Sequence, residues 1–231
     1  MKKASLVFVT LFVFNQVFAQ DCSQSFYAMK EGTKIMMTNF SDKGKATSTN
    51  ESLIKSIKAD GANYEATIEA TVKNDKGKTL AEGKTFTVKC ENGTIKMDIS
   101  SMMMADFAVQ MKSMEVSISG NGIEIPATLT EGLTLSDGST EMKMGSNGMT
   151  FMTMKFDVKN RKVEKIESIT TPAGTFDCFK ITYDMEAKIM FKRSVKVVQW
   201  FAKGVGLVKS ETYNQKGELE GYTELTKFEK P

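Results

Sequence analysis

The chain has 231 residues, of which 41% are hydrophobic and 26% are charged, and these values are those of an ordinary globular protein. There are 31 basic and 28 acidic side chains, so the formal net charge is only +3. Histidine is absent, which excludes Ser-His-Asp and Cys-His catalysis, histidine-ligated zinc and a histidine pH switch.

The first residues predict a secretory signal peptide over residues 1–19. Two lysines precede an apolar stretch from Ala4 to Val17, and Ala19 is the small residue before the expected cleavage point. A transmembrane anchor is the alternative, but the stretch is shorter than the ~20 residues that a bilayer span needs. We therefore expect residues 20–231 to form a single β-rich domain of the periplasm or cell envelope, without an integral membrane span.

Removal of residues 1–19 takes away two lysines and lowers the net charge from +3 to +1. A nearly neutral chain has no electrostatic reason to bind nucleic acid or an anionic membrane. The lysines are interleaved with acidic residues along the predicted strands, which is typical of a solvated surface.

Three cysteines follow the signal peptide, and an odd number allows one disulfide and one free thiol. We expect Cys22 and Cys90 to be bonded, because Cys22 lies in an irregular segment that needs a tether and Cys90 ends a strand-like segment before a turn. Cys178 lies among aromatic residues and is predicted to be a buried thiol. Without histidine nothing activates it as a nucleophile.

Alternation of apolar and polar side chains with period two is the prevailing pattern, and it predicts half-buried antiparallel strands. Clear examples are Tyr64–Val72, Met152–Val158 and Phe179–Met185. Turns that combine polar residues with glycine separate such segments, and one turn type occurs at 42–45, 75–78 and 215–218. These features predict a mainly β protein with about ten long strands in an antiparallel meander.

Residues 101–114 break the strand pattern and predict one short amphipathic helix. Met104, Phe107, Ala108 and Met111 lie at positions i, i+3, i+4 and i+7, which form one stripe on a helix. Residues 121–136 contain Pro126 and Gly132 and look irregular. We predict that this segment is a crossover between two halves of the sheet.

The chain contains 17 methionines, and three interpretations of them remain open. Methionine can fill an irregular core, or it can line a flexible apolar pocket for a lipid or a hydrophobic peptide. The third interpretation is Cu(I) handling, since thioethers favour Cu(I) and the pairs Met111/Met114 and Met142/Met144 are closely spaced. No histidine and no Cys-x-x-Cys motif accompanies those pairs.

Motifs for nucleotides, phosphate and calcium are absent from the sequence, so we expect no cofactor, no metal and no catalytic residue. The acidic residues that could form carboxylate pairs lie on predicted solvated strand faces. An enzyme is therefore not expected.

Two sequence blocks, Thr171–Ile181 (TPAGTFDCFKI) and Trp200–Glu211 (WFAKGVGLVKSE), carry a resemblance to a known family, and the segment Met29–Thr33 adds to it. The chain resembles the TapB-like secreted proteins of Bacteroidetes-type bacteria, a β-rich family of unknown function. The resemblance covers nearly all of the chain after the signal peptide. It implies a periplasmic or envelope location and a strongly curved open sheet or half-barrel, and it implies no catalytic residue.

Together these observations predict a secreted, non-enzymatic protein whose curved sheet, with one short helix, surrounds an apolar concavity. The expected ligand is a lipid, a lipoprotein tail or a hydrophobic peptide. The alternatives are a structural or protein-interaction module of the envelope without a small-molecule ligand and, as a lesser one, Cu(I) handling. The predicted pocket residues are Met104, Phe107, Met111, Met152, Met154 and Phe156.

Overall fold

The computed structural model describes residues 22, 25–27, 30–97, 115–188 and 191–231. The predicted signal peptide and the predicted helix over 101–114 lie outside the described residues. The described part of the chain is almost entirely β. Its strands are β1 (Lys34–Ser41), β2 (Ala46–Asp60), β3 (Asn63–Asn74), β4 (Thr79–Glu91), β5 (Thr94–Met97), β6 (Glu115–Gly120), β7 (Ile123–Pro126), β8 (Gly138–Ser146), β9 (Met149–Thr171), β10 (Gly174–Lys188), β11 (Lys192–Ala202), β12 (Gly206–Tyr213) and β13 (Leu219–Glu229).

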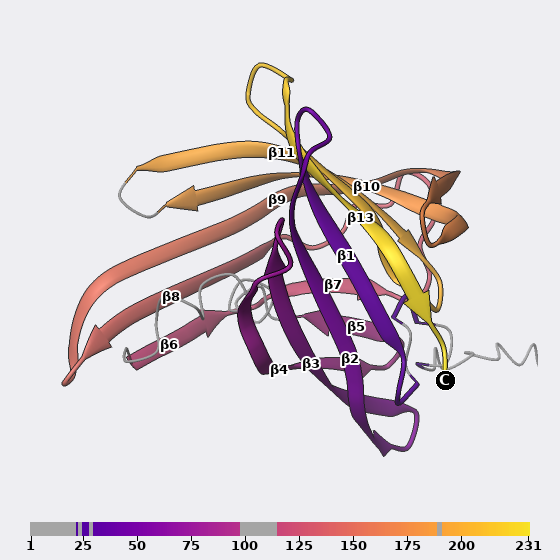
Figure 1. Cartoon of the computed structure of the whole chain (residues 1–231), viewed down its shortest axis with the longest axis horizontal. Helices are drawn as coiled ribbons and strands as arrows, with labels where there is room; N and C mark the ends of the chain where they lie inside the picture. The colour runs from indigo at the N-terminus through magenta and orange to yellow at the C-terminus, as the bar shows by residue number, and fades with distance from the viewer. Residues whose placement is uncertain (1–21, 23–24, 28–29, 98–114, 189–190) are drawn as a thin grey trace, which may run out of the picture.

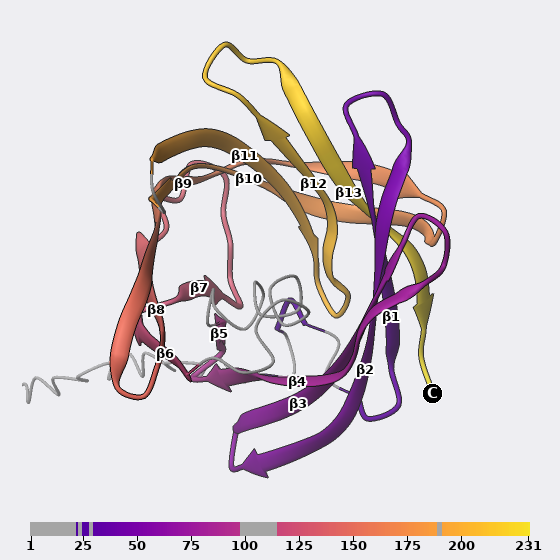
Figure 2. The same ribbon diagram turned by 60° about the vertical axis from the view of Figure 1, so that its left-hand side comes forward.

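All 13 strands belong to one antiparallel sheet, in the order β6-β8-β9-β10-β11-β12-β13-β1-β2-β3-β4-β5-β7. The sheet has two edges, β6 and β7, and it curls around a central space (Figures 1 and 2). This confirms the predicted mainly β fold with a curved open sheet. The sheet has more strands than the ten or so that were predicted, because β5, β6 and β7 are too short to give a clear period-two signal.

The polar turn that occurs three times in the sequence closes three hairpins in the same way. In the β3–β4 turn the Asn74 Oδ1 atom accepts hydrogen bonds from the backbone N–H groups of Lys76 (3.0 Å) and Lys78 (2.9 Å). Asn214 does the same in the β12–β13 turn, and the Ser41 hydroxyl replaces the amide in the β1–β2 turn. A glycine at positive φ completes each turn, since only glycine adopts that conformation without strain.

The two edges of the sheet are joined by the chain itself. Residues 115–126 run from β6, which pairs with β8, into β7, which pairs with β5, through Asn121 and Gly122 alone. The Asn121 N–H donates to the Ser139 carbonyl (3.0 Å), and the Ser139 N–H donates to the Asn121 side chain (2.8 Å). We call this crossing point the seam. The predicted crossover within 121–136 thus exists, but it links the two edges of one sheet and contains the strand β7.

Two groups of buried side chains stabilise the sheet. The larger cluster fills the inside of the curl and includes Phe26, Ile68, Ile95, Met154 and Ile181, each 1% exposed or less. The smaller cluster contains Cys178, Val198, Trp200, Val208 and Leu225, with further residues packed around them. Strand β11 contributes to both clusters, because Val197 and Phe201 belong to the larger one and Val198 and Trp200 to the smaller.

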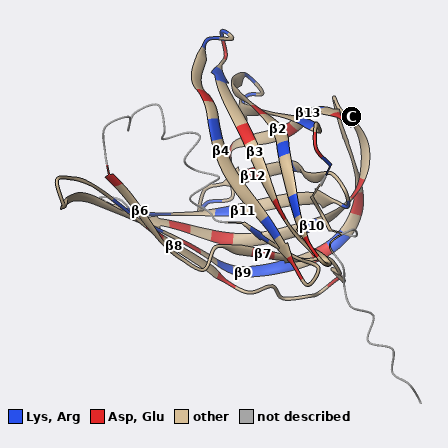
Figure 3. Ribbon diagram, turned by 90° about the horizontal axis from the view of Figure 1, so that it is seen from below, with Lys and Arg blue, Asp and Glu red and all other residues tan. Residues whose placement is uncertain are grey.

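The charged side chains of the strands form pairs between neighbouring strands or along one strand. Examples are Lys73 with Glu51 (2.8 Å) and Lys165 with Glu167 (2.7 Å). Basic and acidic residues are accordingly mixed along strands such as β2, β3 and β9 (Figure 3). The strand faces thus carry the mixed, solvated charge that was predicted from the sequence.

Candidate functional site

A cavity of about 240 Å³ lies on the inside of the curled sheet. Its apolar lining comes from strands that are distant in sequence but close in the sheet: Ile35, Met37, Ile68, Phe86, Val88, Met97, Ile123, Phe201, Val205 and Leu207. Its polar lining consists of neutral side chains: Asn39, Asn50, Ser52, Thr87, Gln199 and Thr223, together with the tyrosines Tyr27 and Tyr183. A cavity of this kind, mostly apolar with a few convergent polar groups, is typical of a small-ligand site.

The polar lining is partly organised by hydrogen bonds inside the protein. The Thr223 hydroxyl donates to the Asn39 Oδ1 atom (2.6 Å), and the Asn39 Nδ2 atom donates to the Ser48 hydroxyl (2.9 Å). The side-chain amide of Gln199, by contrast, has no hydrogen-bond partner among the described residues. It therefore offers one donor group and one acceptor to a bound molecule.

No lysine, arginine, aspartate or glutamate lines this cavity among the described residues. Burial raises the pKa of both Tyr27 and Tyr183, so their hydroxyl groups stay protonated at physiological pH. The site thus carries no formal charge. A charged group that entered it would lose its hydration, and no described lining side chain would supply a counter-ion, which is unfavourable.

One buried charge lies near the cavity but outside its lining. Arg161 is only 3% exposed, and its Nη1 atom donates to the backbone carbonyls of Glu124 (3.0 Å) and Ser136 (2.8 Å). Its Nε atom has no partner among the described groups. Because the two carbonyls belong to β7 and to the segment before β8, Arg161 ties both to β9, and we assign it a structural role.

One end of the curl is closed by a short stretch of the N-terminal region. This closing segment consists of Cys22 and residues 25–27, and Tyr27 contributes to the cavity lining. Phe26 is fully buried and packs edge-on against Phe179, with ring centroids 5.4 Å apart. The Gly204 N–H donates to the Ser25 carbonyl (3.1 Å), and Tyr27 forms a parallel bridge with Val205.

A disulfide between Cys22 and Cys90 ties the closing segment to β4, as was expected from the sequence. Tyr64 adds two contacts, a 2.6 Å hydrogen bond with the Ser25 hydroxyl and a longer one to the Cys22 carbonyl. Burial raises the pKa of Tyr64 to about 12, so its hydroxyl remains a donor at physiological pH. The closing segment is therefore held by covalent, polar and aromatic contacts together.

The remaining cysteine has no features of a catalytic group. Cys178 is a free and fully buried thiol, and burial, together with the charges of Asp177 and Glu167, raises its pKa to about 12. Its Sγ atom donates to the Phe176 carbonyl at 3.4 Å. A neutral buried thiol is a poor nucleophile.

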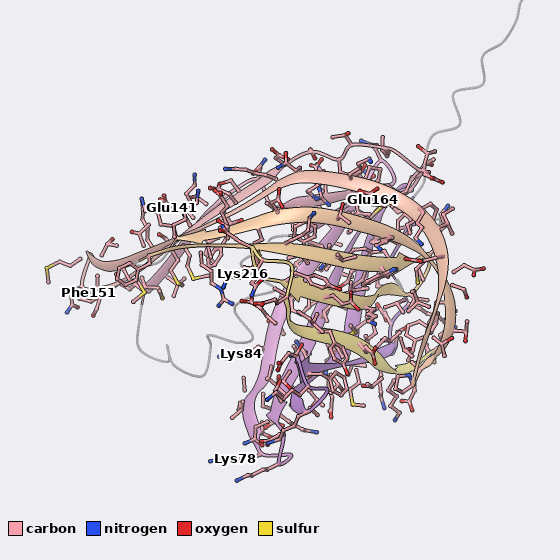
Figure 4. All side chains as sticks on the ribbon, turned by 90° about the horizontal axis from the view of Figure 1, so that it is seen from above. Lys78, Lys84, Glu141, Phe151, Glu164 and Lys216 are labelled. Carbon is pink, nitrogen blue, oxygen red and sulfur yellow. A yellow bond between two sulfur atoms is a disulfide. The ribbon has the colours of Figure 1, made fainter. Side chains whose placement is uncertain are left out.

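The residues that the sequence predicted for the pocket do not line this cavity where the structure describes them. Met154 and Phe156 belong to the larger buried cluster, and Met152 is 42% exposed. Met152 lies on β9 opposite Met144 and next to Phe151, which Figure 4 shows on the part of the β8–β9 hairpin that extends beyond the body. Met104, Phe107 and Met111 lie outside the described residues. Of the described methionines, Met37 and Met97 line the cavity.

The β8–β9 hairpin does bring four methionines together in pairs across the two strands. Met142 lies opposite Met154, and Met144 lies opposite Met152. Met142, Met144 and Met154 are buried, which fits their use as core side chains. Among the described residues, no group of three or more His, Cys, Asp or Glu side chains could hold a metal ion.

Comparisons with known proteins agree with this architecture. The model of the DUF3108-like family matches residues 30–225. The chain belongs to the DUF3108-like family. A crystal structure from Bacteroides fragilis, provisionally described as an exported protein with a YmcC-like fold, superposes with a TM-score of 0.73 and 24% identity, over 89% of this chain and 99% of that chain.

A crystal structure from Parabacteroides distasonis, provisionally described as a lipoprotein, has a TM-score of 0.76 and 24% identity and covers 91% of this chain and 100% of that chain. These likenesses show the fold. Comparison with curated proteins finds no match. The DUF3108-like match supports membership of a β-rich family of unknown function, as predicted, while the TapB-like relationship remains a resemblance. In the described part of the chain, no helix is long and apolar enough to cross a bilayer.

Proposed function

We propose that the protein is a non-enzymatic binding protein of the periplasm or cell envelope. Its ligand is an apolar chain with an uncharged polar end, such as the acyl group of a lipid, a lipoprotein tail or a hydrophobic peptide. The observation that carries this proposal is the cavity of about 240 Å³, which combines an apolar lining with neutral polar groups and has no charged side chain among the residues that the structure describes. The TapB-like resemblance and the exported-type neighbours are consistent with that location.

The distribution of polar groups supports an uncharged ligand end. Asn39, Asn50 and Thr223 lie on adjacent strands, in register positions no more than two residues apart, and Gln199 lies on β11 with an amide that has no partner in the described part of the chain. These groups can donate to and accept from an ester, an amide or a hydroxyl group. A free carboxylate would find no positive charge beside them, so we expect neutral lipids to bind better than fatty acids.

A displacement assay with the purified protein tests this proposal. The neutral dye N-phenyl-1-naphthylamine, which fluoresces in apolar surroundings, serves as the probe, and monodecanoylglycerol and decanoate at neutral pH serve as competitors. We expect monodecanoylglycerol to displace the dye at a concentration at least about tenfold lower than decanoate. Equal displacement, or a preference for decanoate, would contradict the uncharged-end proposal.

Two substitutions in the cavity lining and one control at the surface locate the binding site. Leu207→Trp should fill the cavity and abolish dye binding, whereas Ile166→Trp places the same side chain at an exposed position and should leave binding unchanged. Gln199→Leu should weaken monodecanoylglycerol about tenfold while leaving the dye, which does not need the amide, bound as before. Circular dichroism confirms that each variant keeps the β fold.

The alternatives correspond to distinct results. A folded protein that binds neither the dye nor any acyl chain would favour a structural or protein-interaction module of the envelope. Tight Cu(I) binding that is lost in a Met144→Leu, Met152→Leu variant would favour metal handling at the methionine pairs of the β8–β9 hairpin.

A further inference from the structure

Five hairpin tips lie at the same end of the sheet, opposite to the closing segment. In an antiparallel meander every second connection lies at one end, and the strand order places these five connections along the same edge of the curled sheet. The tips of β8–β9, β10–β11 and β12–β13 point to the left and top in Figure 1, while the β9–β10 turn and the C-terminus lie on the right. We call these tips the hairpin rim. The rim consists of residues 41–45, 74–78, 144–152, 188, 191–193 and 214–218.

The hairpin rim carries most of the large apolar side chains that are exposed to solvent. Met149 is 63% exposed, Phe151 65% and Phe191 83%, and Met152 and Leu80 add to this end of the molecule. Single exposed apolar residues are common, but a concentration of them at loop tips indicates a contact surface. Phe151 points outward near the far end of the β8–β9 hairpin, away from the body (Figure 4).

The hairpin rim also concentrates positive charge, although the whole chain is nearly neutral. Its residues include eight basic side chains and three acidic ones, Asp42, Asp75 and Glu218. Three of the basic residues form ion pairs, Lys45 with Asp75, Lys192 with Glu186 and Arg193 with Glu220. The other five have no acidic partner within the described structure. These five are Lys43, Lys76, Lys78, Lys188 and Lys216.

Unpaired lysines are more frequent at the rim than on the strand faces, where Lys34, Lys58, Lys84 and Lys196 lack an ion pair in the described structure and the other lysines have one. On the strands, lysines such as Lys73, Lys165 and Lys209 have carboxylate neighbours within 4 Å. The β8–β9 tip, in contrast, has no charged residue of its own over its nine positions, MGSNGMTFM, although the Glu115 carboxylate of β6 accepts a hydrogen bond from its Gly148 N–H group (3.3 Å). Exposed apolar side chains and unpaired lysines on the same edge of the sheet fit the interface of an anionic bilayer.

We propose that the hairpin rim docks on the surface of a bilayer that contains anionic lipids. The side chains of Phe151, Phe191 and Met149 enter the interfacial layer, and the free lysines lie among the lipid head groups. The docking itself follows from the rim alone. The docking also deepens the proposed function, because it makes the bilayer the source of the apolar ligand. Only this link between the bilayer and the ligand rests on the proposed function.

Sedimentation of the purified protein with lipid vesicles tests the docking. We expect binding to vesicles of phosphatidylglycerol and phosphatidylcholine in equal parts, at least about tenfold weaker binding to phosphatidylcholine alone, and loss of binding at high salt. The variant Lys43→Glu, Lys76→Glu, Lys216→Glu should lower the partition coefficient by at least about fivefold for each substitution. The variant Phe151→Ser, Phe191→Ser should lower it about tenfold or more.

Matched controls separate the rim from general surface properties. Ile166 is 58% exposed on β9 but lies away from the rim, and Lys58 is exposed near the opposite end of β2 without an ion pair in the described structure. Ile166→Ser and Lys58→Glu should each leave vesicle binding unchanged. Controls that weaken binding as much as the rim variants, or equal binding to both kinds of vesicle, would overturn the proposal. A lack of binding to either kind of vesicle would overturn the proposal as well and would favour a protein partner as the molecule that covers the rim.

The displacement assay distinguishes failure of the docking from failure of the proposed function. Rim variants should still bind N-phenyl-1-naphthylamine in solution as the unchanged protein does, because no rim residue lines the cavity. The cavity variant Leu207→Trp should still bind anionic vesicles. Loss of dye binding in the rim variants would overturn the separation of the two surfaces.

Discussion

The two ends of the curled sheet are built in opposite ways. At the closed end, the segment of Cys22 and residues 25–27 is largely buried, disulfide-bonded to β4 and hydrogen-bonded to β3, to the β2–β3 turn and to the β11–β12 turn. At the hairpin rim, large apolar side chains are exposed and five lysines have no acidic partner among the described residues. The cavity lies between these ends, and Tyr27 of the closed end contributes to its lining.

This difference separates the parts of the molecule that stabilise the fold from those that are free to contact other molecules. Contacts at the closed end are buried, so their removal leaves unpaired groups or empty space. Side chains at the rim touch little protein, so their removal affects stability only slightly. Substitutions at the closed end should therefore lower the free energy of unfolding. Substitutions at the rim should lower binding to other molecules and leave the free energy of unfolding almost unchanged.

The largest effect on stability is expected from the disulfide of the closed end. The cysteines are separated by 68 residues, and opening a loop of that length should lower the free energy of unfolding by about 4 kcal/mol. The variant Cys22→Ser, Cys90→Ser should show this loss in urea unfolding and should also bind the neutral dye more weakly, because Tyr27 is then less firmly held. A loss below about 1 kcal/mol would mean that the hydrogen bonds and the aromatic packing of the closing segment hold it in place without the disulfide.

The seam between the sheet edges should give the next largest effect. A Cβ atom on Gly120 would collide with the Ser139 carbonyl, and the positive φ of Gly120 adds strain. Gly120→Ala should therefore lower the free energy of unfolding by about 3 kcal/mol. The matched variant Gly77→Ala lies in the β3–β4 turn, where a Cβ atom has open space, and should lose only about 1 kcal/mol. Equal losses would show that strain at φ, not crowding, dominates at both sites.

The fold could be predicted from the sequence where strands are long and one face is buried. In β3 the alternation places Ala66, Ile68, Ala70 and Val72 in the core, as their spacing indicates. The short edge strands escaped prediction because four residues of alternation do not differ from a loop. Pro126 in β7 strengthened the loop interpretation, although proline is tolerated on a strand edge.

The site was less predictable, for a physical reason. Alternation identifies the inward face but does not tell which inward side chains pack tightly and which border an empty space. The usable signal was a polar residue at an inward position, as with Gln199 between Val197 and Phe201, or Asn39 two residues after Met37. The near-zero net charge likewise concealed the rim, since only the strand order brings its lysines to one end.

A smaller effect is expected from the hydrogen bonds that close a rim turn. Asn74→Ala removes the acceptor of the backbone N–H groups of Lys76 and Lys78 and should lower the free energy of unfolding by about 1 kcal/mol. Asp75→Ala, in the same turn, removes only a solvent-exposed ion pair with Lys45 and should change stability by less than about 0.5 kcal/mol. Urea unfolding checks both values. A larger loss for Asp75→Ala would mean that charge, not backbone capping, organises this turn.

The smallest change in stability, together with a clear loss of membrane binding, is expected at Phe151 and Phe191. Their side chains are 65% and 83% exposed, so the variant Phe151→Ser, Phe191→Ser should alter the free energy of unfolding by less than about 0.5 kcal/mol. Phe201→Ser, at a 4% exposed position, should lose about 3 kcal/mol or more under the same conditions. If the exposed pair proved nearly as costly to replace as Phe201, these rings would be part of a packed surface. If replacement leaves urea unfolding unchanged and removes binding to phosphatidylglycerol vesicles, the rings serve a contact outside the protein, because the folded chain gains nothing from exposing them.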